Sequence, residues 1–380
     1  MTRMPRDSVQ SVEDVDKDYL TQIVKKTGAG EATVKGFQRD FLQANSFGGG
    51  GIYRFRLDYL EPKPVQVPNS IILKIARPNP HFDGQPGDVC REAQCYQYGL
   101  FDGLSQPLYV PKAYHTVMWP EKNECWIWME DLGADMFHMN WTVPMLQKAV
   151  RDLATLHAHW WGRTDELRQL PFLFHRAHGM FQRIYIEPTK QTFRAIDAHP
   201  LAAAIKRVYT PAREHLLLKL QDMEDVVYPR LDVLPQTLLH HDVWPPNAAF
   251  HDGRTVLIDW AFVGMGTPGA DLCILSAFDE LINPEIVGRA EELLVETLWQ
   301  GLHKDQGLPI SYDEVLQGYR LGLVLRTPTF YVMPVLMGIL AGVSPVANDD
   351  TDFSNTEAWL HISERSFVKL EQTVDAAAIF

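Results

Sequence analysis

Residues 240–247 read HHDVWPPN, and residues 255–260 read TVLIDW. The dipeptide DG at 252–253 lies between them, and an Asp-Gly pair with apolar runs on both sides is typical of the tight turn of a β-hairpin. If these two residues form the turn, the strand register runs back to Asn247 and places it within about one residue of facing Asp259. The sequence therefore predicts a hairpin whose open end carries two oxygen-bearing side chains.

Asn247 and Asp259 offer hard oxygen ligands of the kind that Mg²⁺ prefers, with phosphate oxygens and water to complete the coordination. Asp242, five residues before Asn247, lies on the loop that leads into the hairpin. There it is placed to accept a proton from a hydroxyl group that attacks a phosphate. A carboxylate that orients the acceptor, together with metal ligands that neutralise phosphate charge, is what phosphoryl transfer requires.

The pattern His240-x-Asp242-x4-Asn247, followed by Asp259 in an Ile-Asp-Trp triplet, resembles the catalytic loop and metal-binding aspartate of the aminoglycoside phosphotransferase and choline kinase-like family, relatives of the protein kinases. The resemblance implies ATP and Mg²⁺ as cofactors and phosphorylation of a hydroxyl group on a small molecule. It makes Asp242 the catalytic base and Asn247 and Asp259 the ligands of Mg²⁺, with His240 bracing the loop. Asp271 matches an aspartate that supports this loop in the family, and its other reading is a helix N-cap.

The resemblance also implies the fold class: an α+β, two-lobed protein-kinase-like fold, with a small N-terminal antiparallel sheet lobe and a larger, mainly helical C-terminal lobe. The apolar pattern agrees, because alternation over 52–60 and an apolar run over 70–77 predict strands, whereas the later chain is mainly helical. We expect a nucleotide-binding lobe over 1–130, with a lead-in segment over 1–26, and a catalytic and substrate lobe over 131–380.

A kinase of this kind needs a strand lysine for the α- and β-phosphates and a helix glutamate that pairs with it. Lys74 lies in the strand expected over 70–77, among apolar neighbours. Glu92 lies on the apolar side of a helix that we expect over 88–101. The sequence therefore predicts an ion pair between these two side chains.

Two further segments of this lobe are expected to contact the nucleotide. Successive glycines let backbone N–H groups approach phosphates closely, so we expect a phosphate loop at 46–51, although it lacks the G-x-G-x-x-G spacing of protein kinases. The adenine is expected beside the strand and hinge over 128–132. The residues expected to bind the cofactor are Ser46, Gly48, Gly49, Gly50, Lys74, Glu92, Glu130 and Leu132.

Two positions of the catalytic loop region depart from patterns known in related kinases. His241 stands where relatives often have glycine, which could crowd the loop. Trp260 and Ala261 replace the Phe-Gly pair of protein kinases, as is usual in the small-molecule family. Regulation of the protein-kinase type is therefore not implied.

The acceptor is the least defined part of the reaction. Residues 275–380 contain 16 acidic and 6 basic residues, so acidic helix faces there could attract a cationic amino sugar or amino alcohol. The alternative is that these are ordinary solvated faces. The strings LHAHWW at 156–161 and HDVW at 241–244 also resemble the ecdysteroid kinase-like branch of the family, which keeps apolar alcohols open.

Two other functions compete with a kinase. A kinase-like protein that binds nucleotide without catalysis would fit the fold, but the polar residues that the chemistry needs are present. His240, His241 and Asp242 could instead hold a metal in a hydrolase, but adjacent residues point in different directions and no further histidine lies nearby at ligand spacing. His157 is expected to pack or to form a hydrogen bond under the loop.

Composition narrows the remaining classes. The 380 residues are 46% apolar, with 10 Trp, 13 Tyr and 18 Phe, which excludes an intrinsically disordered chain. A formal net charge of −13 argues against nucleic acid as a partner. No secretory signal opens the sequence, and the longest apolar run, 330–343, contains Pro334 and predicts a buried helix rather than a membrane span. Four cysteines without metal-site spacing predict reduced core thiols in a cytoplasmic protein.

Overall fold

The computed structural model describes residues 9, 11–44, 49–60, 64–78, 90–104, 106–133, 137–342 and 356–380. The chain divides into two units. The first comprises Met1–Asp102 and Val110–Ala134, and the second comprises Gly103–Tyr109 and Asp135–Phe380.

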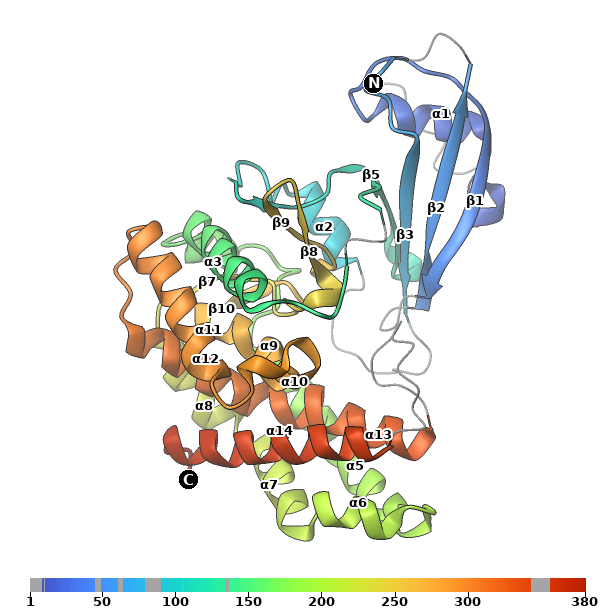
Figure 1. The fold of residues 1–380 in the computed structure, drawn as a ribbon. Coiled ribbons are helices and arrows are strands. Elements are labelled where there is room, and N and C mark those ends of the chain that lie inside the picture. The colour runs from blue at the N-terminus through green and yellow to red at the C-terminus, as the bar shows by residue number, and fades with distance from the viewer. Residues whose placement is uncertain are drawn as a thin grey trace. The chain divides into compact units, whose positions relative to one another are not determined.

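The first unit is built on a five-stranded antiparallel sheet in the order β1-β2-β3-β6-β5 (Figure 1). The strands are β1 (Val34–Ala44), β2 (Gly49–Tyr59), β3 (Ser70–Arg77), β5 (Ala113–Trp119) and β6 (Glu124–Glu130). Helix α1 (Lys17–Lys25), which forms within the expected lead-in segment, packs on one face. Helix α2 (Arg91–Gln97) packs on the other face, so both sides of the sheet are covered.

The alternation of β3 sorts its side chains between these two faces. Leu73 and Ile75 join the core under α1, where the buried ring of Trp128 also lies. Ala76 joins the smaller core under α2. Lys74, which lies between Leu73 and Ile75 in sequence, therefore faces α2, as the sequence predicts.

Two local expectations for this unit differ from the structure. The helix expected over 88–101 is described only from residue 90, and it is shorter, since turns follow Gln97. The glycines at 49–51 do not form a loop but begin β2, where they pair with residues 75–77 of β3. Glycine has no side chain to oppose such pairing, so the ladder continues into the glycine run.

The second unit is mainly helical, as predicted. Its α-helices are α3 (Val143–His159), α4 (Thr164–Arg168), α5 (Ala177–Ala195), α6 (Ala202–Val208), α7 (Pro211–Gln221), α8 (Glu224–Asp232), α9 (Cys273–Ala277), α10 (Asp279–Ile282), α11 (Ala290–Trp299), α12 (Tyr312–Arg326), α13 (Met333–Ala341) and α14 (Thr356–Ala376). Helix α14 lies beside α13 and also contacts α6 and α12 (Figure 1). The long C-terminal helix is thus part of the helical core.

Short strands and turns carry the loop that the sequence singles out. The strands are β4 (Leu108–Tyr109), β7 (Thr237–Leu239), β8 (Ala248–His251), β9 (Arg254–Leu257) and β10 (Gly264–Gly266). Strand β7 pairs with β10, whereas β8 and β9 form a hairpin to which β4 adds in parallel. The 3₁₀ turns η5 (Pro245–Asn247) and η7 (Pro268–Leu272) lie in the connections.

A continuous helical run connects α12 and α13 through a π-helical segment, η10 (Thr327–Val332). By length and composition the run Tyr312–Ala341 could cross a membrane, but 78% of its most apolar window is buried inside the protein. A mostly buried apolar helix is typical of the core of a globular protein. The buried helix predicted from the apolar run at 330–343 is therefore confirmed for the part that the structure describes.

Candidate active site

The hairpin has the register that the Asp-Gly turn predicts. His251 pairs with Arg254, and the backbone N–H of Ile258 donates to the carbonyl oxygen of Asn247 at 2.9 Å. Asn247 is thus held at the open end of the hairpin, one residue away from the position opposite Asp259. The tight turn fixes this register because it leaves no freedom to slip by a residue.

Asn247 is tied to the residue expected to be the base. Its amide nitrogen Nδ2 donates to a carboxylate oxygen of Asp242 at 2.6 Å and to the Asp242 carbonyl oxygen at 3.1 Å. Both amide hydrogens are therefore committed to Asp242, which leaves the Asn247 oxygen Oδ1 as the acceptor atom of this side chain. The expected base and an expected metal ligand are therefore joined directly by hydrogen bonds.

Two carboxylates of the loop region influence each other. Burial, followed by the negative charge of Asp259, raises the pKa of Asp242 to about 7, although Arg326 and the hydrogen bond from Asn247 act in the opposite direction. Asp259 itself has a left-handed backbone, with φ of 63°. The structure therefore brings Asp242, Asn247 and Asp259 together, as the sequence predicts.

Asp271 holds the start of the loop through hydrogen bonds to its backbone. Its side chain is fully buried, and its two oxygens accept the backbone N–H groups of His240, at 3.0 Å, and His241, at 2.5 Å. The ring nitrogen Nε2 of His157 donates to the same carboxylate at 3.0 Å. His157 is therefore the hydrogen-bonding histidine that we expect, and Asp271 supports the loop.

The charge of Asp271 is stabilised by these donors. Burial alone would raise the pKa of this carboxyl, but the hydrogen bond and charge of His157, with the charges of His241 and His240, outweigh it and lower the pKa to about 2. The alternative reading of Asp271 as a helix N-cap is wrong, because Leu272 is the N-cap of α9 and makes no side-chain cap. The carboxylate accepts hydrogen bonds from the loop instead.

His240 braces the loop against the hairpin. Its Nδ1 accepts the N–H of Asp242 at 3.2 Å, and its Nε2 lies 3.0 Å from the carbonyl oxygen of Ile258, to which it donates. The ring also packs against Trp260, with 4.4 Å between ring centroids. Because both ring nitrogens are engaged, a role for His240 as a metal ligand of a hydrolase is disfavoured.

Arg326 is a residue of this site that the sequence analysis misses. It ends α12, is 3% exposed, and its guanidinium donates through Nη2 to the carbonyl oxygen of His241. The signal that could have found it is a lone charge within the apolar stretch 321–332, since an arginine is almost never fully buried without partners.

The expected ion pair forms in the first unit. Nζ of Lys74 lies 2.5 Å from Oε2 of Glu92, and the two residues are 7% and 4% exposed. Strand β3 supplies the lysine and helix α2 supplies the glutamate. The pairing predicted from residue type and position is therefore confirmed.

The glycine run is only partly described. Ser46 and Gly48 lie outside the described residues, whereas Gly49 and Gly50 start β2. Gly50 has φ of 142°, and a Cβ atom there would lie 2.3 Å from the backbone oxygen of Ile75. Position 50 therefore requires glycine because of this close approach to β3.

The end of β6 is anchored by a residue that the sequence analysis does not single out. Asp131 accepts hydrogen bonds from the guanidinium of Arg54, at 2.7 and 3.1 Å, and from the hydroxyl of Ser70, at 2.6 Å. The backbone N–H of Glu130 donates to the carbonyl oxygen of Lys112 at 2.9 Å, and Leu132 is half-buried. The expected hinge segment is thus fixed to β2 and β3.

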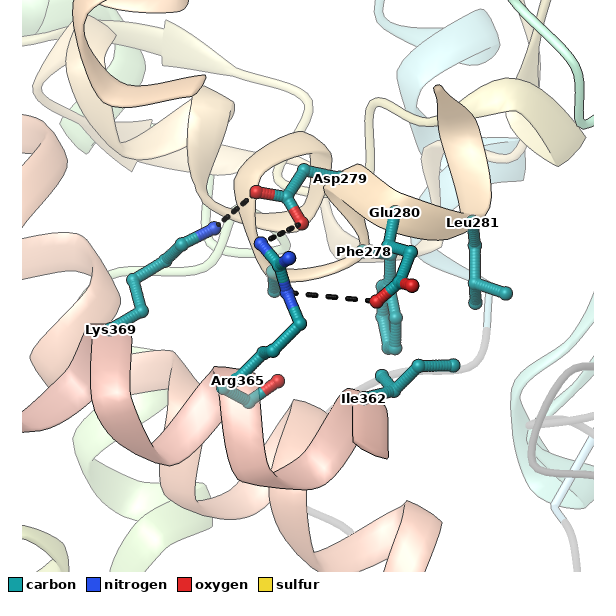
Figure 2. Close-up of a pocket in the computed structure, with 9 residues that line it drawn as sticks. Phe278, Asp279, Glu280, Leu281, Ile362, Arg365 and Lys369 are labelled. Atoms are coloured by element: carbon teal, nitrogen blue, oxygen red, sulfur yellow. Dashed lines mark hydrogen bonds and ion pairs between the residues drawn. The ribbon is translucent and has the colours of Figure 1, made fainter. Parts of the chain in front are cut away.

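Several of the acidic residues after position 275 are paired with basic side chains. Figure 2 shows Arg365 and Lys369 of α14 reaching Asp279, with Nζ of Lys369 2.8 Å from the Asp279 carboxylate. Arg365 also lies 3.6 Å from Glu280. Further pairs between described residues are Glu291 with Arg320, Asp305 with Arg151, and Glu364 and Glu371 with Arg213. These ion pairs connect neighbouring helical segments.

In the described part of the chain, no group of three His, Cys, Asp or Glu side chains is placed to hold a metal ion. The four cysteines are buried and unlinked, as expected. The oxygen donors that the sequence assigns to a hard cation are the carboxylate of Asp259 and the amide oxygen of Asn247.

Comparison with solved structures identifies the fold. A choline kinase from Cryptosporidium parvum Iowa II is 10% identical, with a TM-score of 0.55, and the match covers 99% of this chain and 95% of that one. An aminoglycoside phosphotransferase from Alicyclobacillus acidocaldarius is 14% identical over 92% and 95% of the two chains, with a TM-score of 0.48. A choline kinase from Streptococcus pneumoniae is 16% identical over 87% and 94%, with a TM-score of 0.46. The first likeness supports the kinase-like α+β fold.

Comparison of the sequence gives the family. No curated protein matches the chain significantly. A model of the phosphotransferase enzyme family matches residues 69–307, which include β3, the Asp271-supported loop and the hairpin. Since the match covers more than half of the sequence, the chain belongs to the phosphotransferase enzyme family.

Proposed function

We propose that the protein is an ATP- and Mg²⁺-dependent phosphotransferase that phosphorylates a hydroxyl group of a small molecule. The observation that carries the proposal is the pair of Asp242 and Asn247 on a loop held by Asp271, with Asp259 following β9 close to it, in a chain of the phosphotransferase family. Phosphoryl transfer needs positioning and charge stabilisation more than covalent chemistry, and such a cluster supplies both.

The donor atoms fit Mg²⁺. Asn247 spends both amide hydrogens on Asp242, so its oxygen is the atom that would face a cation. The charge of Asp259 raises the pKa of Asp242, and a bound cation would relieve the repulsion between these two carboxylates. When bound, Mg²⁺ neutralises charge on the phosphates of the nucleotide.

Asp242 has the position of the acceptor-orienting base. The hydrogen bond from Asn247 engages Oδ2, which leaves Oδ1 to accept a hydrogen bond from the attacking hydroxyl. The N–H of Asp242, bound to the ring of His240, keeps the backbone in place. In this role the carboxylate would orient the hydroxyl and take its proton as the new O–P bond forms and the bond from the γ-phosphorus to the departing ADP breaks.

The first unit would bind the nucleotide. Lys74, paired with Glu92, has the charge and the fixed position to grip the α- and β-phosphates. Ser46, Gly48, Gly49 and Gly50 are proposed to approach the phosphates, and the backbone of Glu130 and Leu132 to contact the adenine. Domain roles follow the same division, with 1–130 binding nucleotide and 131–380 carrying the chemistry and the acceptor.

For the acceptor, the ion pairs weaken the case for a cationic molecule only in part, because several but not all of the acids after 275 have basic partners. A group of aromatic rings includes one residue of the loop, Trp244. Trp244 lies 6.0 Å from Phe278, which lies 5.6 Å from Tyr331, measured between ring centroids. Phe278 and Tyr331 are buried, so these rings do not decide between an apolar alcohol and an amino alcohol, and both classes belong in the screen.

The test combines nucleotide binding with turnover. We expect ATP with Mg²⁺ to raise the Tm of the protein, and ATP consumption to depend on an added acceptor in a screen of amino sugars, amino alcohols and sterols. Asp242→Ala should lower kcat by about 1,000-fold or more while the Tm shift with ATP persists. Asp165→Ala, at an exposed helix position, is the matched control and should keep wild-type turnover.

Each alternative gives a different result. Nucleotide binding without turnover on any acceptor would favour a binding protein. Bound zinc, with activity that a chelator removes and nucleotide does not affect, would favour a hydrolase. Normal turnover by the Asp242→Ala variant would overturn the role given to this carboxylate.

A further inference from the structure

Arg326 carries a buried charge at the junction of two helical segments. It is the last residue of α12, and the π-helical segment Thr327–Val332 follows directly. π-Helical segments inside regular helices are frequently found at functional sites. A guanidinium that is only 3% exposed must be compensated by specific partners, since burying a bare charge is costly.

The partners of Arg326 are backbone carbonyls on two separate segments. Nη2 donates to the carbonyl oxygen of His241, and Nη1 lies 3.5 Å from the carbonyl oxygen of Ala270. His241 directly precedes Asp242, and Ala270 directly precedes Asp271. One planar fork therefore joins the loop to the segment that supports it, next to the point where the Asp271 carboxylate joins them.

His241 needs such support because of its backbone. Its φ is 66°, a left-handed conformation that favours glycine and costs energy for a side chain with a Cβ atom. Its N–H is held by Asp271 and its carbonyl by Arg326, so the peptide groups on both sides of the strained residue are fixed. The histidine at a position where glycine would be relaxed is thus matched by a two-sided clamp.

We propose that Arg326 is a positioning residue, which fixes the peptide bond between His241 and Asp242 and thereby the direction of the Asp242 carboxylate. The inference rests on the proposed function for its effect on catalysis. The hold on the loop does not depend on that function and can be measured separately. Lysine would not replace the arginine fully, because a single ammonium group lacks the planar fork that spans two carbonyls.

The first measurement is kinetic. Arg326→Met should lower kcat by about 100-fold, the scale expected when a catalytic group is misplaced by about 1 Å. The KM for ATP and the Tm shift with ATP should stay unchanged, because the nucleotide is held elsewhere. Arg326→Lys keeps the charge and is the variant less prone to misfold. Its kcat should lie between those of wild type and Arg326→Met.

The matched control is Arg320→Met, on the same helix. Arg320 is bound instead to Glu291 of α11, at 2.7 and 3.2 Å. Its loss should reduce stability without a change in kcat per folded molecule. If the kcat of Arg326→Met, corrected for the folded fraction, stays within about threefold of wild type, the positioning role is wrong.

The second measurement needs no turnover. Amide hydrogen exchange over 238–250 should be about tenfold faster in Arg326→Met than in wild type, because the loop loses one side of its clamp. Unchanged exchange there would overturn the proposal. If exchange is faster in Arg326→Met than in wild type but wild type turns over no acceptor, the proposed function fails while the clamp stands.

A double variant tests the link to the strained residue. With His241→Gly the left-handed conformation is no longer strained, so Arg326→Met should cost about 10-fold in kcat rather than about 100-fold. An equal cost in both backgrounds would show that Arg326 acts on catalysis by a route other than His241, which contradicts the proposal.

Discussion

Two buried carboxylates, one in each unit, are stabilised in different ways. In the first unit, Lys74 on β3 and Glu92 on α2 form an ion pair 2.5 Å long. In the second, the carboxylate of Asp271 collects backbone N–H groups from two adjacent residues and the ring of a third, His157. A pair of opposite charges fixes the distance between two elements. A carboxylate bound to backbone donors fixes the course of the chain itself, which is what a catalytic loop needs.

The largest effect on stability is expected from breaking the ion pair. Lys74→Met leaves the carboxylate of Glu92 buried without its lysine, and removing one partner of a buried pair costs about 3 kcal/mol or more. Chemical denaturation of the variant should show this loss, and ATP turnover should fall with it if Lys74 binds phosphate.

A double variant separates the two roles of the lysine. Lys74→Met combined with Glu92→Leu removes both charges and should regain most of the lost stability, since an apolar pair of similar volume is often neutral. Turnover should not return. Recovered turnover in the double variant would mean that Lys74 has a structural role alone.

The sequence predicts best the features whose signals are local, in both units. The strand alternation around Lys74, the helical position of Glu92 and the Asp-Gly turn each lie within a few residues of the feature that they determine. The course of β2 was mispredicted at Gly49 and Gly50, because a glycine run is compatible with both a loop and a strand end. Packing against β3 decided between them.

The next effect concerns the carboxylate. The folded-state pKa of Asp271, about 2, lies below the ordinary value of 3.8, so its ionised form stabilises the fold above pH 4 by about 2 kcal/mol. This contribution is lost as the pH falls from about 4 to 2, because the folded state then binds the proton that the unfolded state already holds.

Asp271→Asn cannot ionise and should lack this dependence. We expect the variant to be about 2 kcal/mol less stable than wild type at neutral pH, and the difference to shrink below pH 4. Urea unfolding at pH 7 and pH 3 measures both values. A difference that stays constant over this range would mean that neutral packing of the side chain, rather than its charge, supports the loop.

The contacts of the second unit are hard to foresee because they join distant parts of the chain. Arg326 reaches the carbonyl of His241, and His157 reaches Asp271, across separations of 85 and 114 residues. Backbone groups have no residue-type signature, so a carbonyl partner leaves no trace in the sequence. The resemblance to a known loop supplied the role of Asp271, whereas nothing comparable pointed to Arg326.

The smallest effect is expected at the end of the sheet. Ser70→Ala removes the 2.6 Å hydrogen bond to Asp131 but leaves both bonds from Arg54, so the loss should be about 1 kcal/mol. Thermal unfolding measures it. A loss as large as that of Lys74→Met would show that the hinge segment is held cooperatively, and the contrast between the two units would then be smaller than we describe.

The short strand β4 makes the second unit discontinuous in sequence. Leu108 and Tyr109 pair in parallel with Thr255 and Val256, although the chain before and after this segment belongs to the first unit. A single cut after residue 134 therefore cannot yield a complete second unit, because β9 would lose a neighbour and expose unpaired backbone groups prone to association. A catalytic fragment would need residues 103–109 joined back by circular permutation. During synthesis, about 145 further residues must be made before the partner strand of this segment emerges.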